Sequence, residues 1–347
     1  MIGYVIKRSL WTVMLLLIIS FVTFLLFFIL PSDVIASRAP VASTTSLADQ
    51  YRFEGQSLPA EYGQFVWAVV RHGEFGQSFR DRRPVSDKLQ EAVPVTATLV
   101  IGGSLLWVLM AFPIGILSAL RPRSLLDRTT MIFVLIGVSA HPLWISLVFS
   151  YVFGVRLHWM PVAGYCDFFH PPGSCGGALE WAYHMVLPWL TYAFLFAALY
   201  ARMIRATVLE TLHEDYVRTA EGKGAGRARV LRSHVLRNAL LPVITMLGMD
   251  VGIAFYGAIF IETAYGLPGV GKLMVDALPR GDLPVIMGVV LVVSFAVAIA
   301  TTIVDFTYRW LDPKIRLSAS AREVPLRMPV ALRLPRPRFK VSGSPTT

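Results

Sequence analysis

The chain has 347 residues, 55% of them hydrophobic and 16% charged, with a mean hydropathy of +0.60. A water-soluble chain of this length needs far more polar surface to cover its core, so the composition excludes an ordinary soluble enzyme or binding domain. The net charge of +10 does not by itself indicate a nucleic-acid partner, because most of the basic residues lie beside apolar segments.

Six apolar segments are long enough to cross ~30 Å of hydrocarbon, which takes about 20 helical residues at 1.5 Å each. The fourth is short and has Pro188 near its start, but the alternation of charge along the chain requires it. These segments predict an all-α integral membrane protein with six transmembrane helices. They cover residues 10–30, 95–120, 131–155, 185–201, 240–261 and 285–304.

Basic residues set the predicted orientation, because cationic loops resist translocation and stay in the cytoplasm. With the N-terminus inside, the cytoplasmic segments hold 22 of the 32 lysines and arginines. We therefore predict a multi-pass plasma-membrane protein with both termini in the cytoplasm. The basic segment 227–237 has no accompanying zinc-finger spacing or RNA-binding aromatic motif, so no nucleic-acid partner is expected.

The first apolar segment has features of a secretory signal, since Lys7 and Arg8 precede it and small residues follow at 36–39. Its apolar run is about twice as long as the usual signal core of roughly 7–15 residues. We therefore predict an uncleaved membrane anchor.

Four regions follow along the chain. Residues 1–30 form the N-terminal cytoplasmic end and the first transmembrane helix, and residues 31–94 form an extracytoplasmic insertion. The insertion has an amphipathic stretch at 62–79, which we expect along the membrane face. Residues 95–310 are the core domain with the other five transmembrane helices. Residues 311–347 are a basic, proline-rich cytoplasmic tail without apolar periodicity, which predicts disorder.

The two cysteines, Cys166 and Cys175, fall in the predicted outer loop between the third and fourth spans. A bacterial-type exterior allows oxidation, so we predict a disulfide that stiffens this loop by about 2–3 kcal/mol. The alternative is a pair of unpaired thiols.

The predicted inner loop before the fifth span reads as two helices separated by glycines. Residues 205–224 are good helix formers, which Gly222 and Gly224 are expected to terminate, and a basic helix at 225–238 then leads to Pro242. A helix, glycine and helix along the inner face would give a protruding knob for a protein partner. The alternative is an interfacial hairpin that only anchors the loop.

Asp250 lies ~15 Å into the fifth span, near mid-membrane. An acid at that depth costs about 2.5–3.5 kcal/mol on insertion scales, so it needs a water-filled path or a polar partner. Gly248 and Gly252 are small enough to let a substrate approach, which favours a translocation pathway. The alternative is a carboxylate that accepts a hydrogen bond from a neighbouring helix, for example from Thr191 or Ser294.

Residues 266–272 match the first seven positions of a phosphate-binding loop, but Leu273 stands where Ser or Thr must reach magnesium, and no strand precedes the motif. We predict instead a tight re-entrant turn whose three glycines, Gly266, Gly269 and Gly271, supply φ above zero.

Covalent chemistry has no other support in the sequence. Neither H-E-x-x-H nor G-x-S-x-G occurs, and the seven histidines show no metal-ligand spacing, so we predict no catalytic residue and no metal site. Asp250 and Asp305 resemble an intramembrane acid pair, but Asp305 lies at the cytoplasmic end of its span, which argues against pairing.

Short motifs throughout residues 1–317 identify a family. The chain resembles the permease subunits of binding-protein-dependent ABC importers, specifically the first of the two permeases in the dipeptide, oligopeptide and nickel class. The motifs are Val5-Ile-Lys-Arg8, Gly76-Gln-Ser-Phe-Arg80, Pro113-Ile-Gly115, Leu157-His-Trp-Met-Pro161, Leu236-Arg-Asn-Ala-Leu-Leu-Pro242 and Leu311-Asp-Pro-Lys-Ile-Arg316, together with the inner loop and the turn.

The resemblance implies a type I importer permease fold with a cytoplasmic coupling helix of the EAA type for an ATPase subunit. Here Arg218-Thr-Ala220 replaces the family's Glu-Ala-Ala, Leu267 replaces a frequent aromatic residue, and Asp250 replaces a neutral polar one. The implied coupling residues are Tyr216, Arg218, Thr219, Ala220, Glu221, Lys223 and Gly224. The implied extracytoplasmic turn contains Glu262, Gly266, Pro268, Gly269 and Gly271.

The expected function is import of short peptides as one subunit of a larger assembly. The implied partners are a second permease, two ATP-binding subunits and an extracytoplasmic substrate-binding lipoprotein. ATP and magnesium would bind to the partner subunits, and this chain would have no cofactor and no catalytic role. Alternatives are nickel or another small solute carried by the same machinery, and a membrane sensor or intramembrane enzyme.

Overall fold

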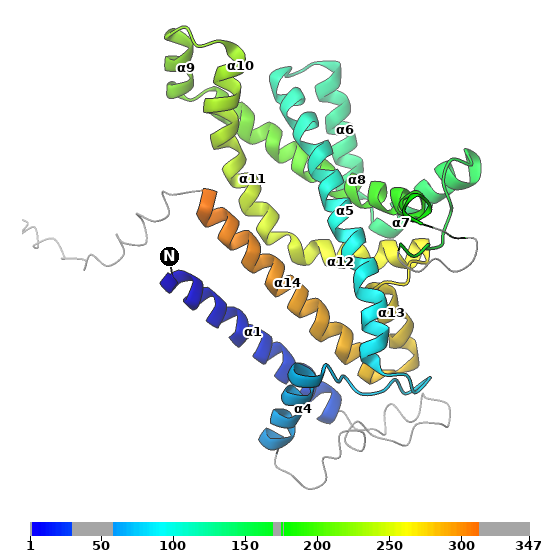
Figure 1. Ribbon diagram of the computed structural model, residues 1–347. Coiled ribbons are helices and arrows are strands. Elements are labelled where there is room, and N and C mark those ends of the chain that lie inside the picture. The colour runs from blue at the N-terminus through cyan, green and yellow to red at the C-terminus, as the bar shows by residue number, and fades with distance from the viewer. Residues whose placement is uncertain (1, 30–57, 169–174, 176, 312–347) are drawn as a thin grey trace, which may run out of the picture. The chain divides into compact units, whose positions relative to one another are not determined.

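The computed structural model describes residues 2–29, 58–168, 175 and 177–311, and nearly all of them are helical (Figure 1). The chain divides into two compact units, Met1–Tyr308 and Arg309–Thr347. The predicted tail beyond residue 311 and the first part of the insertion, 31–57, lie outside the described residues. The helices of the first unit and its boundary are α1 (Ile2–Ile29), α4 (Leu58–His72), α5 (Val85–Leu120), α6 (Leu125–Ser139), α7 (Pro142–Phe149), the π-helical η1 (Ser150–Arg156), α8 (Ala178–Leu212), α9 (Asp215–Gly222), α10 (Arg227–Arg229), the π-helical η2 (Val230–Leu236), α11 (Arg237–Met249), α12 (Val251–Tyr265), α13 (Val270–Ala277), η3 (Leu278–Arg280) and α14 (Leu283–Leu311).

Four of these helices, α1, α5, α8 and α14, are each long and apolar enough to cross a membrane among the described residues. Two bent helix pairs have the same character, which gives up to six spans if each pair is one span. The predicted fourth span is longer than expected, because α8 continues through Pro188 and extends from Ala178 to Leu212.

The predicted third span is not one straight helix. The segments Leu125–Ser139 and Pro142–Arg156 meet at an angle of 116°. Ala140 and His141 are extended at the break, with ψ of 135° and 140°. The cause is Pro142, because a proline excludes the preceding residue from helical backbone and starts the next helix well.

The predicted fifth span is also bent, with an angle of 63° between Arg227–Leu247 and Gly252–Tyr265. Asp250 lies at the junction of α11 and α12, with φ −86° and ψ −3°. Hydrogen bonding continues across it, since its N–H donates to the Met246 carbonyl and its carbonyl accepts from the Ala254 N–H. The junction therefore bends the helix without interrupting its backbone hydrogen bonds.

The main core lies between α5 and α8, where glycines allow close approach. A Cβ on Gly103 would lie 2.4 Å from the Tyr192 ring, and one on Gly115 would lie 2.8 Å from the Ala201 carbonyl oxygen. The Trp107 ring of α5 stacks on three aromatic rings of α8. These contacts hold the two long helices in one register.

The N-terminal helix α1 lies beside α14 in Figure 1. The Thr12 and Thr302 hydroxyl oxygens are 3.2 Å apart, and Arg8 forms an ion pair with Asp305. Asp305 is thus paired with a basic residue on α1, and the alternative of an Asp250–Asp305 acid pair is wrong.

The amphipathic helix expected at 62–79 is α4, which is shorter than predicted and ends at His72. Its Phe65 is buried against Phe24 of α1, whereas Trp67 is 62% exposed. The apolar residues of α4 are therefore divided between the protein core and the surface, and only the exposed ones are available to a membrane face.

Candidate functional site

The helix α9 is short and attached to the rest of the chain by one face. Its Val217 is buried and its Ala220 half-buried, and both belong to the cluster that contains Val230 and Val235 of η2. The Tyr216 hydroxyl accepts a hydrogen bond of 2.9 Å from the Asn238 amide. The rest of the helix surface is exposed and polar. It carries Arg218, Thr219 and Glu221, and the exposed Lys223 follows at the C-cap.

Two breaks isolate α9, and the sequence predicted only the second. The helix expected over 205–224 is interrupted at His213 and Glu214, so α8 ends at Leu212 and α9 begins at Asp215. The basic helix expected at 225–238 consists of α10, η2 and the start of α11.

Gly224 ends α9 with a φ of +83°. The Gly224 N–H donates to the Glu221 carbonyl (2.9 Å), and the Ala225 N–H donates to the Ala220 carbonyl (3.2 Å). This pair of bonds is a Schellman motif, in which the residue after the C-cap is left-handed. Gly222, by contrast, is the last residue of the helix itself. The conformational requirement for glycine therefore falls on Gly224 alone.

Asp250 is 8% exposed, and its carboxylate accepts a hydrogen bond of 2.8 Å from the Tyr200 hydroxyl of α8. The alternative in which Asp250 accepts a hydrogen bond from a neighbouring helix is therefore correct. The donor, however, is Tyr200 and neither Thr191 nor Ser294. Thr191 instead pairs with the Tyr265 hydroxyl at 2.8 Å. The signal for Tyr200 in the sequence was its place in an aromatic series with a four-residue spacing, Tyr192, Phe196 and Tyr200.

The turn between α12 and α13 is built around a buried carboxylate. Glu262 is fully buried, and one oxygen accepts from the Thr96 hydroxyl of α5 (2.6 Å) while the other accepts from the Lys272 N–H (3.0 Å). The Thr96 hydroxyl oxygen also accepts from the Val270 N–H (2.8 Å). Glu262 and Thr96 together therefore satisfy free N–H groups at the start of α13, where negative charge is favourable.

The prediction for the turn glycines was correct for one of three. Gly266 is left-handed with φ +67°, but Gly269 has φ −92° and Gly271 is helical. Gly269 and Gly271 are needed for space, because a Cβ would lie 2.3 Å from the Glu262 carboxyl carbon or 2.6 Å from the Ile259 Cα. Pro268, which lies between Gly266 and Gly269, is exposed. Two of the glycines are thus explained by close packing, Gly269 against the Glu262 carboxylate and Gly271 against the backbone of α12, which the sequence does not reveal.

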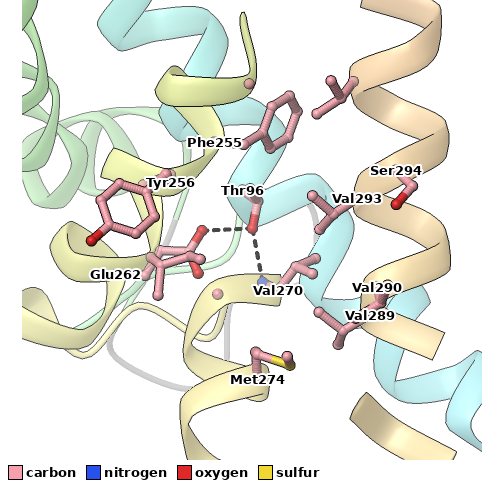
Figure 2. A pocket seen from close by; sticks show the side chains of 15 residues that line it. Thr96, Phe255, Tyr256, Glu262, Val270, Met274, Val289, Val290, Val293 and Ser294 are labelled. Carbon is pink, nitrogen blue, oxygen red and sulfur yellow. Dashed lines mark hydrogen bonds between the residues drawn. The ribbon is translucent and has the colours of Figure 1, made fainter. Parts of the chain in front are cut away.

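A mostly apolar cavity of about 280 Å³ opens beside this turn. Figure 2 shows Glu262 and Thr96 on one side and valines of α14, including Val289 and Val293, on the other. Gly252 contributes to the lining, whereas the Asp250 carboxylate is turned toward α8. The predicted pathway residues therefore divide between the cavity and the core. Gly248 lies in α11, two residues before the bend.

Cys166 and Cys175 form a disulfide in this structure, with Cα atoms 5.5 Å apart. The Cys166 sulfur lies 3.4 Å from the His184 Nδ1. Among the described residues, the two cysteines and Glu180 place their ligand atoms within 4.8 Å of one another. Both sulfurs are bonded to each other, so they cannot act as thiolate ligands unless the bridge is reduced.

Comparison with known proteins gives two matches to one transport family. Residues 111–317 match the binding-protein-dependent transport system inner membrane component. Residues 1–100 match the N-terminal part of the binding-protein-dependent transport system membrane component.

Individual relatives are similar along almost their whole length. A putative peptide transport system permease protein of Brucella abortus (strain 2308) is 32% identical over 319 residues, which are 91% of this chain and 99% of that protein. A probable D,D-dipeptide transport system permease protein of Escherichia coli (strain K12) is 32% identical over 334 residues, and the match covers 90% of this chain and 97% of that protein. A probable peptide ABC transporter permease protein of Sinorhizobium fredii is 31% identical over 316 residues, and the match covers 90% of this chain and 99% of that protein.

The region 111–317 contains all of α8 and α9, the bend at Asp250 and the Glu262 turn. With its all-helical architecture and its several apolar helices, the chain therefore belongs to the binding-protein-dependent transport system inner membrane components, the multi-pass permease subunits of ABC transporters with the type I importer fold.

Proposed function

We propose that this protein is a permease subunit of an ABC importer for short peptides. The relatives from Brucella abortus, Escherichia coli and Sinorhizobium fredii are each named for peptide or dipeptide transport, and each aligns with at least 90% of this chain. Family membership and this agreement among the relatives support peptides over nickel or another small solute.

The observation that carries the mechanism is the two-faced helix α9. Its apolar face is packed on η2, and its polar face, with Arg218, Glu221 and Lys223, is exposed. In our proposal this face is the coupling surface, which docks on an ATP-binding subunit in the cytoplasm. Tyr216, Thr219, Ala220 and Gly224 would shape and end the helix. A short capped helix moves as a unit, so it can transmit a partner's displacement to α8.

The bend between α11 and α12 is our candidate for the moving part of the translocation pathway. Gly248 and Gly252 flank Asp250 there, and a Cβ added to Gly252 would have no atom within 4 Å. In the present conformation Tyr200 holds the Asp250 carboxylate in the core. Alternating access requires contacts that differ between two states. We propose that the Asp250–Tyr200 hydrogen bond breaks in the other state and exposes the acid to the α-ammonium or a cationic side chain of the peptide.

The remaining parts of the proposal concern the assembly. A second permease would complete the pathway, and two ATP-binding subunits would bind ATP and magnesium and carry out hydrolysis. An extracytoplasmic lipoprotein would deliver the peptide near the Glu262 turn. Both termini of this chain would lie in the cytoplasm, and none of its residues would perform covalent chemistry.

The test is uptake of labelled short peptides by proteoliposomes that contain the co-purified complex and its binding protein. We expect ATP-dependent accumulation, and we expect Asp250→Asn to weaken the preference for cationic and free-amine peptides. ATP hydrolysis that is stimulated by the binding protein without uptake of any peptide would contradict the peptide assignment. It would move the substrate to nickel or another solute.

A further inference from the structure

A buried polar cluster joins α5, α6 and α8 close to the start of the α9 segment. At its centre is the carboxylate of Asp127, a residue that is only 5% exposed. Its Oδ1 accepts from the Ser118 hydroxyl and from Arg205 Nε (2.6 Å). Its Oδ2 accepts from Arg205 Nη2 (2.9 Å) and from the Arg123 N–H (2.9 Å). Each oxygen of this carboxylate thus has two donors within the described residues.

The ion pair has the two-pronged geometry that fixes orientation as well as distance. A guanidinium presents two parallel N–H groups to a carboxylate, so rotation or sliding of either helix breaks at least one bond. Compared with apolar residues of the same shape, a buried ion pair contributes little to stability, and a role in specifying one arrangement is its better-attested use. In the Asp127–Arg205 pair the carboxylate is buried and the guanidinium half-buried, and we therefore consider a role in fixing the arrangement of α6 and α8.

The position of the pair supports that role. Arg205 is two helical turns, ~10 Å along the axis, before α8 ends at Leu212. Ala201 lies one turn before Arg205 on α8, and its backbone is close to Gly115 of α5. A Cβ added to Gly115 would lie 2.8 Å from the Ala201 carbonyl oxygen. The end of α8 that leads into α9 is thus joined to α5 by packing and to Asp127 in the first turn of α6 by charge.

We infer that Asp127 and Arg205 are positioning residues that form a strut, through which displacement of α9 and the end of α8 is passed to α5 and α6. This inference rests on the proposed function, because the displacement comes from an ATP-binding partner at α9. While the strut is rigid, each ATP hydrolysis event is coupled to movement of the translocation pathway. A loosened strut lets α8 move without α5 and α6, and ATP is then hydrolysed without transport.

The test compares Arg205→Lys with Arg202→Lys in the reconstituted complex. Lysine keeps the positive charge but replaces the two-pronged contact with a point charge. Arg202 is the matched control, because it is exposed on the same helix one turn away. The measurements are the amount of assembled complex, ATP hydrolysis and peptide uptake, each with and without binding protein.

We expect Arg205→Lys to assemble and to hydrolyse ATP, and to lower the uptake per ATP hydrolysed by about tenfold, the effect of losing one charge-assisted hydrogen bond. Arg202→Lys should leave that ratio unchanged. A merely structural role would lower the amount of complex and leave the ratio of uptake to hydrolysis intact. That pattern would overturn the inference.

Ser118→Ala keeps the test decisive if Arg205→Lys does not accumulate in the membrane. It removes one donor to Asp127 and leaves the ion pair in place, and we expect a smaller fall in the same ratio. An unchanged ratio in Ser118→Ala would then overturn the strut. Failure of the proposed function gives a different result, since the wild-type complex itself would show no peptide uptake, and that result overturns both.

Discussion

Replacement of Gly224 by alanine tests whether the end of α9 matters for transport. Gly224 has φ +83°, and its N–H and that of Ala225 close the Schellman motif at the end of the helix. No atom lies within 4 Å of an added Cβ at this position, so the substitution creates no clash. The only perturbation is the strain of a left-handed alanine.

The magnitude follows from the backbone alone. A left-handed conformation costs a residue with a Cβ about 1–2 kcal/mol. That energy shifts the equilibrium between the closed and the unravelled helix end by a factor of about 5–30. Since α9 has only eight residues, unravelling its last turn alters Lys223 and Glu221 on the exposed face.

Gly222→Ala is the matched control. Gly222 is helical and also has no atom within 4 Å of an added Cβ. Alanine should strengthen α9 there, by roughly 0.5–1 kcal/mol. The two variants thus add the same methyl group two residues apart with opposite effects on the helix end.

The assay is ATP-dependent peptide uptake by the reconstituted complex, normalised to the amount of permease in the membrane. We expect Gly224→Ala to lose most of its uptake at normal abundance, and the bulkier Gly224→Asp to abolish uptake. Gly222→Ala should stay close to wild type. Equal uptake by Gly224→Ala and Gly222→Ala would refute the reasoning that the left-handed end of α9 is required for coupling.

Three further predictions concern stability, and each is measured by thermal unfolding in detergent. Gly269→Ala places a Cβ 2.3 Å from the Glu262 carboxyl carbon and should destabilise the protein by about 1–3 kcal/mol; an unchanged midpoint would count against the packed turn. Tyr200→Phe leaves the Asp250 carboxylate without its donor and should cost about 1–3 kcal/mol. Combining it with Asp250→Asn should cost less than the sum of the two single changes, and additivity would mean that the two groups do not interact. Cys166→Ser opens a loop with a sequence separation of 9 and should cost about 2–3 kcal/mol; reductant should lower the midpoint of wild type only, so a reductant-sensitive variant would contradict the bridge.

The general architecture was predictable from the sequence, because membrane insertion depends on the local composition of each segment. The all-α class, the long helices α1, α5, α8 and α14, and the position of the segment that contains α9 follow from apolar runs, basic flanks and helix-ending glycines. The break in the third predicted span also has a local cause, Pro142. The prediction missed it because that span was predicted from its apolar residues alone.

The candidate site was predictable in its residues but not in their contacts. The sequence drew attention to Asp250, Glu262 and the glycines of the turn, because acids within apolar segments and clustered glycines are unusual there. It did not identify Tyr200 as the partner of Asp250 or Thr96 as the partner of Glu262. The predicted reason for Gly269 and Gly271, a φ above zero, was also wrong, because both glycines are needed for space.

The physical reason lies in the separation along the chain. Composition, capping and turn chemistry act over a few residues, so the sequence determined the helices, the length and apolarity that let them cross a membrane, and the left-handed end of α9 at Gly224. The Glu262–Thr96 contact joins residues 166 positions apart, and the Asp250–Tyr200 contact joins residues 50 apart. Only the packing of α5, α8 and α12 against one another brings those side chains together, and only the tertiary structure decided which donor each buried acid found.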